Sequence, residues 1–295
     1  MTREINKKGI YSALVTPLDK NGEVSYENLA QLVRYEKKSG VEGFYCCGSS
    51  GEGLLLSDEE RMKVVETVAK EKGDLPLIVH TGAMSSRSSI RLSQHAEKSG
   101  AAAVSMIPPI YYKYSQEEIE ANYLRVADHI HIGMIVYNIP MFTGVAFTKA
   151  SPILTDERII GIKNTSYNLY DLERMKDAYP QKLLFNGFDE IYLSSLSAGA
   201  TATIGTTMNV CPRIFQKIRT CFEESRIADG QELQARANDF MEALVGTHSL
   251  YAATKYCLTQ LGVDCGECRE PFLPLNDAQK AVSLHALENI MQYEK

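Results

Sequence analysis

The sequence predicts an α/β fold, a (β/α)₈ TIM barrel with a C-terminal helical extension. Eight short apolar runs alternate with amphipathic segments over about 220 residues, which is in the usual range for such a barrel. Each run is almost continuously apolar, as parallel strands covered on both faces are. Neither a GxGxxG turn nor a Walker motif occurs, so a doubly wound nucleotide-binding sheet fits the chain less well.

The expected strands and helices have clear start and end signals. Ser57 and Ser115 are each followed three residues later by glutamate, which fits a capping box at the start of a helix. Glycines follow three helical stretches, where a C-terminal cap is expected; these are Gly40, Gly73 and Gly100. The strands are expected to begin near Ile10, Gly43, Leu75, Ala102, Gly133, Ile159, Leu183 and Thr201.

The last part of the chain has helical patterns and no strand patterns. Helices are expected at about 231–247, 250–262 and 277–293. A chain of 295 residues suits one large domain or two small ones. We therefore expect residues 1–225 to form the barrel and residues 226–295 to pack on it as an extension.

Charge and hydropathy restrict the classes of partner. The formal net charge of −6 argues against nucleic acid or an anionic membrane as a partner, so a small molecule is the expected ligand. No apolar run approaches the roughly 18 residues of a membrane span. The first residues are polar and lack the apolar core of a signal peptide, so we expect a cytoplasmic protein.

The cysteines do not predict a disulfide framework or a metal centre. Seven of them are scattered through the chain, at positions 46, 47, 211, 221, 257, 265 and 268. An odd and scattered set is typical of reduced thiols. Cys265 and Cys268 form one isolated CxxC, and zinc would need a second pair of ligands. No metal site is expected.

Lys163 is the first candidate for catalysis. It ends the apolar run Ile159–Lys163, where a buried strand is expected, and lysine is rarely buried without a partner. Removing an ammonium group from water favours the neutral amine, which attacks carbonyl carbon. The alternative is an ordinary lysine that reaches solvent from a strand end. The residues at the ends of the other strands favour the catalytic interpretation.

A tyrosine and a hydroxyl-rich turn are expected beside this lysine, because the C-terminal ends of barrel strands share one face. Tyr137 ends the fifth strand, where alternation places it with Ile135, on the face opposite Met134 and Val136. A phenol beside an amine can transfer a proton, although core tyrosines are common. The turn Gly48–Glu52 offers hydroxyls and exposed amides to a carboxylate, although it also fits an ordinary βα turn.

Further polar groups end the last three strands. They are Thr165 after the sixth strand, the run Gly187–Glu190 after the seventh and the run Gly205–Thr207 after the eighth. A nucleophile, a proton carrier, an anion site and paired carboxylates thus converge on one end of one barrel. Because no cofactor motif accompanies them, the expected chemistry is a Schiff base between Lys163 and a carbonyl substrate, with no cofactor.

Four motifs in order along the chain resemble a known superfamily. GSSGE, YNIP, GIKNTS and GFDE have the order and spacing of the pyruvate-dependent class I aldolases that include N-acetylneuraminate lyase and dihydrodipicolinate synthase. The resemblance covers essentially the whole chain. It implies a homotetramer that forms an imine between Lys163 and the keto carbon of pyruvate.

The resemblance also implies roles for individual residues. Tyr137 would transfer protons to and from the aldol oxygen, and Ser49 and Ser50 would bind the substrate carboxylate. In the synthases a tyrosine from a neighbouring subunit joins the proton relay, and the resemblance implies that Tyr111 is its counterpart here. The remaining substrate-binding positions that the resemblance implies are Thr165, Gly187, Asp189, Glu190, Gly205 and Thr206.

Three positions favour the lyase branch, which cleaves N-acetylneuraminate reversibly to N-acetylmannosamine and pyruvate. Phe142 stands where the synthases carry an arginine for the carboxylate of their second substrate. The run Gly187–Glu190 matches the lyase motif whose carboxylates bind sugar hydroxyls, and Thr165 and Thr206 match lyase positions, although the second is more often serine.

Two departures from the lyase pattern keep other substrates open. Phe188 lacks the phenol hydroxyl often found there, and Tyr167 is bulkier than the expected glycine. The alternatives are an aldolase or dehydratase for another 2-keto-3-deoxy sugar acid, and then dihydrodipicolinate synthase. A catalytically silent barrel that binds a ligand is the alternative outside enzymes.

Overall fold

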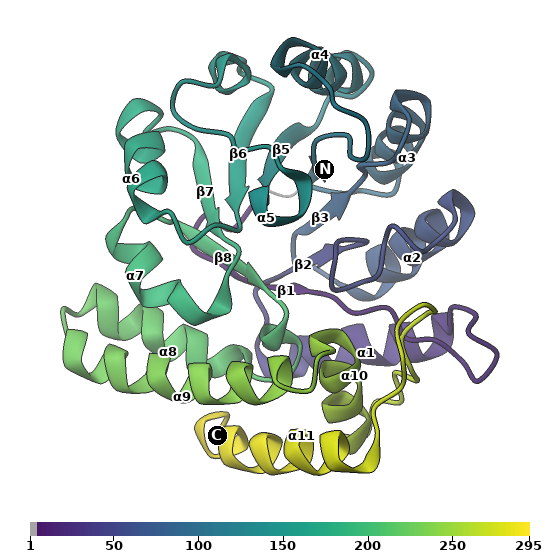
Figure 1. Cartoon of the computed structure of the whole chain (residues 1–295), viewed down its shortest axis with the longest axis vertical. Helices are drawn as coiled ribbons and strands as arrows, with labels where there is room; N and C mark the ends of the chain where they lie inside the picture. The colour runs from purple at the N-terminus through teal and green to yellow at the C-terminus, as the bar shows by residue number, and fades with distance from the viewer. Residues whose placement is uncertain (1–4) are drawn as a thin grey trace.

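A computed structural model describes residues 5–295 and has the predicted fold. Eight parallel strands form a closed barrel in which each strand pairs with its neighbours in chain order, and β8 closes on β1 (Figure 1). The strands are β1 (Ile10–Ala13), β2 (Gly43–Cys46), β3 (Leu77–His80), β4 (Ala103–Met106), β5 (Gly133–Asn138), β6 (Ile159–Asn164), β7 (Leu183–Asn186) and β8 (Ala202–Gly205).

Helices follow the strands and surround the barrel (Figure 1). They are α1 (Tyr26–Ser39), α2 (Asp58–Glu71), α3 (Ser86–Lys98), α4 (Gln116–Ala127), α5 (Pro140–Thr143), α6 (Leu169–Ala178), α7 (Tyr192–Ser197) and α8 (Pro212–Glu223). Both predicted capping boxes are present, at Ser57 before α2 and Ser115 before α4. The glycines expected after helices lie at positive φ, and Gly40 caps α1 at a φ of 104°.

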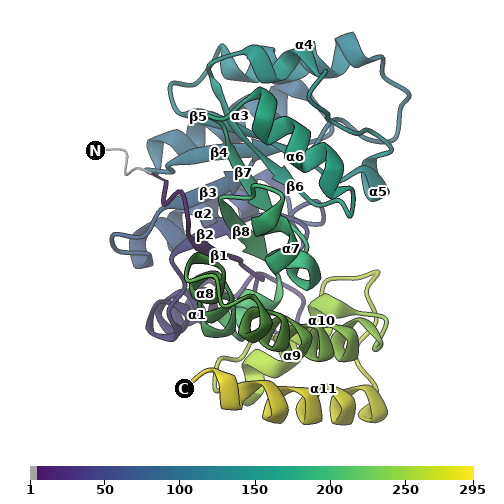
Figure 2. The same cartoon turned by 90° about the vertical axis from the view of Figure 1, so that its left-hand side faces the viewer.

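Three further helices form the C-terminal part of the chain, α9 (Ile227–Val245), α10 (Leu250–Gln260) and α11 (Asp277–Ile290). α9 begins four residues before the predicted start at 231, and Gly230 lies buried within it, against Leu193 of α7 and Cys221 of α8. In Figures 1 and 2, α9 runs beside α8, and α11 runs beside α9. The division of the chain at residue 225 stays a prediction.

The core has two layers, as the near-continuous apolar strands predicted. Large side chains such as Tyr11, Tyr45 and Phe185 fill the interior of the barrel. A larger cluster lies between the strands and the surrounding helices. β5 shows the predicted alternation: Ile135 and Tyr137 belong to the interior cluster, whereas Met134 and Val136 belong to the outer cluster.

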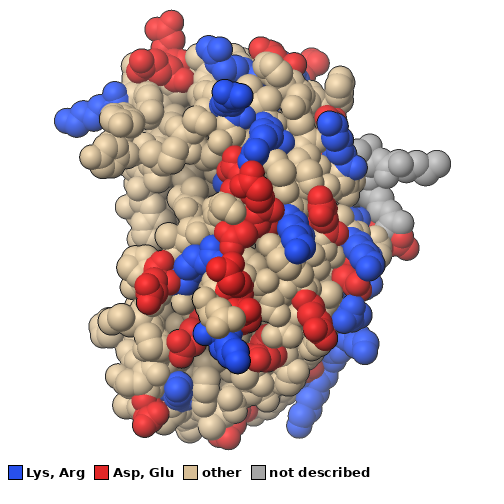
Figure 3. All heavy atoms as spheres, turned by 90° about the vertical axis from the view of Figure 1, so that its right-hand side faces the viewer, with Lys and Arg blue, Asp and Glu red and all other residues tan. Residues whose placement is uncertain are grey.

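Charged groups of both signs are mixed on the face that carries α2 and α3 (Figure 3). Arg91, for example, pairs with Asp58 and Glu59. Among residues 5–295, no helix is long and apolar enough to cross a membrane. All seven cysteines are free thiols, and six of them are buried.

A buried ion pair joins the C-terminal helices to the barrel. Lys255 of α10 lies 2.5 Å from Glu52, at the end of the hydroxyl-rich turn after β2, and both side chains are almost completely buried. Glu52 also accepts a hydrogen bond of 2.6 Å from the backbone N–H of Arg269. The pair therefore fixes the position of this turn relative to α10.

Replacing Lys255 with methionine is expected to destabilise the fold. The change leaves the buried Glu52 carboxylate without its counter-charge, which costs about 3–5 kcal/mol in the free energy of unfolding. Urea unfolding of the variant measures this loss. The combined variant Glu52→Gln/Lys255→Met should recover part of the lost free energy of unfolding. If its loss instead equals the sum of the losses of Glu52→Gln and Lys255→Met, the two charges do not stabilise each other.

Candidate active site

A cavity of about 510 Å³ opens at the C-terminal end of the barrel, where the sequence predicted the site. Its walls come from the ends of the strands, from α5 and from the segment between α9 and α10. The predicted site residues that line it are Ser49, Ser50, Tyr137, Lys163, Thr165, Gly187, Asp189, Glu190 and Thr206. Of the predicted residues, only Tyr111 and Gly205 do not line this cavity.

Lys163 lies at the bottom of this cavity and is only 4% exposed. β5 and β6 pair in register so that Lys163 stands opposite Tyr137. The Lys163 Nζ lies 3.7 Å from the centre of the Tyr137 ring and 5.1 Å from that of Tyr45. Within residues 5–295, no carboxylate forms an ion pair with Lys163, and its Nζ lies against these two aromatic rings instead.

The Tyr137 phenol is set up for proton transfer. Burial by itself raises the pKa of this phenol, but the Lys163 ammonium and the nearby hydroxyls of Ser49 and Thr165 outweigh burial and lower the pKa below its ordinary value. Tyr45, which is also buried beside Lys163, differs: its hydroxyl donates to Ser105 and burial raises its pKa. Of these two tyrosines, Tyr137 is therefore the one suited to act as a base.

The turn after β2 places hydroxyls beside the lysine. Ser50 is buried, and its Oγ lies 2.7 Å from the Oγ1 of Thr206 after β8. Ser49 lies in the same turn, in which the backbone N–H of Glu52 donates to the Ser49 carbonyl at 3.0 Å. The two serines and Thr206 thus form a group of small donors that suits a carboxylate.

Asp189 is a buried carboxyl in which one oxygen accepts hydrogen bonds and the other accepts none from the described residues. The backbone N–H and the hydroxyl of Thr207 both donate to Oδ2, at 2.8 and 2.6 Å. Oδ1 is buried and has no partner among the described residues. Burial raises the pKa of Asp189 to about 6, against the effect of the Thr207 hydrogen bonds.

The two glycines predicted at the site make room for its polar side chains. A Cβ on Gly205 would lie 1.7 Å from Asp189 Oδ1, and a Cβ on Gly187 would lie 1.9 Å from Thr165 Oγ1. Neither position can carry a side chain without displacing its neighbour. The Thr165 hydroxyl is itself buried, and it lies beside the Tyr137 phenol whose pKa it helps to lower.

Glu190 lies in the wall of the cavity with an aromatic pair. The Tyr167 hydroxyl donates to Glu190 Oε1 at 2.6 Å, and the Tyr167 ring stacks on Phe188 with ring centres 4.4 Å apart. Glu190 Oε2 is buried without a partner in the described part of the chain. The two departures from the lyase pattern, Tyr167 and Phe188, are therefore in contact with each other.

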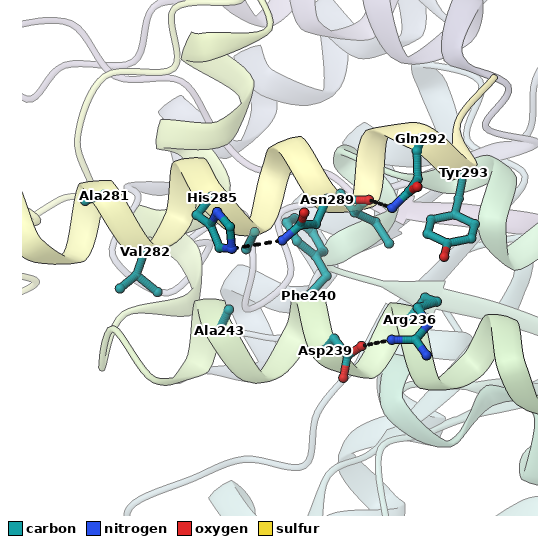
Figure 4. Close-up of a pocket in the computed structure, with 12 residues that line it drawn as sticks. Arg236, Asp239, Phe240, Ala243, Ala281, Val282, His285, Asn289, Gln292 and Tyr293 are labelled. Carbon is teal, nitrogen blue, oxygen red and sulfur yellow. Dashed lines mark hydrogen bonds and ion pairs between the residues drawn. The ribbon is translucent and has the colours of Figure 1, made fainter.

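A second cavity, of about 620 Å³, lies between α9 and α11 (Figure 4), and none of its lining residues lines the cavity that contains Lys163. Two pairs of its polar side chains are hydrogen-bonded along their own helices: Arg236 with Asp239 at 2.8 Å, and His285 with Asn289 at 3.1 Å. Because the buried lysine and the unpaired acceptors line the other cavity, we place the active site at the barrel mouth.

Comparison with known proteins agrees with this geometry. Residues 6–290 match the model of the dihydrodipicolinate synthetase family. The chain belongs to this family. This membership confirms the superfamily predicted from the four sequence motifs.

The family members similar to this chain include lyases. The chain is 37% identical to N-acetylneuraminate lyase of Rhizobium meliloti, over 98% of this chain and 97% of that protein. The structure of CdNal from Clostridium difficile in complex with mannosamine has a TM-score of 0.93 at 32% identity, over 96% of this chain and 99% of that one. A catalytic lysine mutant of Ruminococcus gnavus sialic acid aldolase has a TM-score of 0.93 at 29% identity, over 99% and 98%. These similarities confirm the predicted lyase branch.

Tyr111 lies outside the cavity of its own chain. It is 87% exposed, in the loop between β4 and α4, and its φ is +80°. Its ring contacts Tyr112 edge to face, with ring centres 5.1 Å apart. An exposed position is what a residue needs to reach the site of a neighbouring subunit, and that role of Tyr111 stays a prediction.

Sequence reasoning missed several residues of the site. Tyr45 beside the lysine could have been found from alternation along β2. Thr207 was noted only as part of the run Gly205–Thr207, without its role as a donor to Asp189. Tyr251 of α10 and Phe272 of the following loop also line the cavity. No sequence signal indicated that the C-terminal helices complete the active site.

Proposed function

We propose that this chain is an N-acetylneuraminate lyase, which cleaves the open-chain sialic acid reversibly to N-acetylmannosamine and pyruvate. The observation that carries the proposal is the buried Lys163 amine against the face of Tyr137, in a cavity whose other wall presents unpaired acceptors. The similarity to lyases over nearly the whole chain supports it, and one of them, the Ruminococcus gnavus aldolase, has a catalytic lysine.

The reaction follows from the positions of these groups. The Lys163 ammonium gives up one proton and its amine attacks the keto carbon of the substrate. The proton is returned to the resulting carbinolamine hydroxyl, which leaves as water, and an iminium ion forms. Tyr137 removes the proton from the hydroxyl on the second carbon after the iminium carbon. The bond between this hydroxyl-bearing carbon and the carbon before it breaks, and its electron pair enters the iminium to give an enamine. The aldehyde end leaves as N-acetylmannosamine. The enamine takes up a proton at carbon, and water releases pyruvate from Lys163.

The other residues bind and orient the substrate in this proposal. Ser49 and Ser50, with their backbone amides, bind the carboxylate next to the keto group. Asp189 and Glu190 accept hydrogen bonds from the hydroxyls of the sugar chain, since each has a buried oxygen without a partner among the described residues. No cofactor is required, because the iminium itself accepts the electron pair.

Glu190→Gln is expected to lower kcat/KM for N-acetylneuraminate about tenfold, because a neutral amide replaces a charged acceptor for a sugar hydroxyl. Pyruvate binding should be unchanged, since Glu190 is assigned to the sugar chain. Steady-state cleavage and borohydride trapping of pyruvate measure the two effects. Equal loss in both would show that Glu190 does not bind the sugar.

The assembly and location belong to the same proposal. We expect a cytoplasmic homotetramer in which Tyr111 of one subunit joins the proton relay of its neighbour. The exposed tyrosines at 111 and 112 support an interface at this loop. Sedimentation velocity measures the oligomeric state, and a stable monomer with full activity would contradict the role of Tyr111.

A second candidate function uses the same imine chemistry on a different sugar acid. Tyr167 and Phe188 alter the wall that meets the sugar chain, which favours an aldolase or dehydratase for another 2-keto-3-deoxy sugar acid. Dihydrodipicolinate synthase fits less well, because Phe142 at the cavity wall offers no charge to an anionic second substrate.

The deciding experiment is pyruvate release from N-acetylneuraminate by the purified protein, followed by borohydride reduction and mass analysis. We expect pyruvate release and a reduced pyruvate adduct on Lys163. An adduct on Lys163 without cleavage of N-acetylneuraminate would point to the second candidate. No adduct and no cleavage by the folded protein would leave a silent ligand-binding barrel.

A further inference from the structure

Tyr167 combines two contacts that fix one position of its side chain. Its hydroxyl donates to Glu190 Oε1 at 2.6 Å, and its ring stacks on Phe188 with an angle of 16° between the ring planes. The residue as a whole is nevertheless 63% exposed. All three residues line the cavity that contains Lys163. Tyr167 is thus a fixed part of the cavity wall rather than a freely moving surface tyrosine.

The hydroxyl proton of Tyr167 is donated in the hydrogen bond to Glu190. The hydrogen bond to this carboxylate raises the pKa of Tyr167 to about 12, so the phenol stays protonated and continues to donate. The polar groups left at this wall are the lone pairs of the Tyr167 oxygen and the buried Oε2 of Glu190, which has no partner among residues 5–295. Both are acceptors, so they suit hydroxyl donors and disfavour anions.

The two ends of the cavity differ in depth. Lys163 is 4% exposed at its bottom, whereas Tyr167 is 63% exposed at its rim. A substrate whose keto carbon reaches Lys163 therefore has the far end of its chain near the rim, and Tyr167 is one of the residues that line the cavity there. In N-acetylneuraminate this far end carries neutral hydroxyls, the groups that the two acceptors fit.

We propose that Tyr167 is a specificity-determining residue of this enzyme, which holds Glu190 in one orientation and supplies a second acceptor for the terminal hydroxyls of the substrate chain. This inference rests on the proposed function and refines its sugar specificity. It also accounts for the two departures together: the phenol that position 188 lacks is supplied by position 167, and Phe188 is the surface on which Tyr167 stacks.

The test compares two substrates with the variant Tyr167→Phe, which keeps the stacked ring and removes only the hydroxyl. The first substrate is N-acetylneuraminate. The second is its seven-carbon analogue, which lacks the last two carbons and their hydroxyls. It is made from a glycoside, which protects the keto group, by periodate and borohydride treatment and then hydrolysis. Tyr170→Phe is the matched control, because Tyr170 lies nearby on α6, is 71% exposed and does not line the cavity.

We expect Tyr167→Phe to lower kcat/KM about tenfold for N-acetylneuraminate, the usual effect of one hydrogen bond to a charged group. The loss for the seven-carbon analogue should be less than about twofold, and Tyr170→Phe should resemble wild type on both. Equal losses on the two substrates, or no loss on either, would overturn the role of Tyr167. A wild-type enzyme that cleaves neither substrate would instead overturn the proposed function, and the role of Tyr167 with it.

Discussion

Replacing Lys163 with alanine is expected to abolish pyruvate release from N-acetylneuraminate, a loss of roughly 10⁶-fold, the size seen when an enzyme loses its nucleophile. The reason is chemical: without the amine no imine forms, and the breaking carbon–carbon bond has no acceptor for its electrons. Continuous pyruvate detection with wild type and variant in parallel measures the loss. The fold should survive, because Lys163 has no ion-pair partner within residues 5–295 that the change would leave unpaired.

The chain contains a natural control for this experiment. Lys255 is also a fully buried lysine, but its ammonium is paired with Glu52 at 2.5 Å and donates to the carbonyl of Glu267 at 3.0 Å. Lys163 instead faces the cavity and two aromatic rings. Borohydride in the presence of pyruvate should therefore label Lys163 and leave Lys255 unmodified. Turnover that persists in Lys163→Ala, or an adduct on Lys255, would exclude the imine mechanism proposed for Lys163.

Much of the fold was predictable because its signals are local. Apolar runs of strand length, capping boxes and glycines after helices each depend on a few neighbouring residues, and they placed all eight strands in the right order. Once the strands form a barrel, their C-terminal ends must converge. This is why Tyr137, Lys163 and Glu190 could be brought to one cavity without knowledge of a single contact.

The contacts within the site were not predictable in the same way. Tyr167 follows β6 and Glu190 follows β7, so their proximity is implied by the barrel, but the hydrogen bond between them depends on the side-chain rotamers. The pairing of Asp189 with Thr207 likewise depends on the close approach that Gly205 permits. The sequence showed the two departures separately and could not show that they contact each other.

The C-terminal helices show a further limit of sequence reasoning. Periodicity indicates which face of a helix is apolar, but not the angle at which the helix packs on the barrel. Tyr251 and Phe272 therefore could not be assigned to the cavity wall that they form. The ion pair between Glu52 and Lys255 is equally hidden, because 203 residues separate its partners along the chain.

Replacing Tyr137 with phenylalanine is expected to lower kcat by roughly 10²–10⁴, the usual contribution of a positioned acid–base group. The positive charge on Lys163, which helps to lower the Tyr137 pKa, persists when the amine becomes an iminium. The phenol thus remains easy to deprotonate in the step that breaks the carbon–carbon bond. Imine formation does not need this hydroxyl, so borohydride should still trap pyruvate on Lys163 in the variant.

Tyr45→Phe is the control that distinguishes the loss of proton transfer by Tyr137 from the general effect of removing a buried hydroxyl. Tyr45 is buried beside the same lysine, but its hydroxyl donates to Ser105 and its pKa is raised rather than lowered. Removing this hydroxyl should reduce kcat by less than about tenfold, the scale of one ordinary hydrogen bond. Similar losses in the two variants would mean that the tyrosines only shape the pocket, and a Tyr137→Phe variant with wild-type kcat would assign the proton transfer to another group.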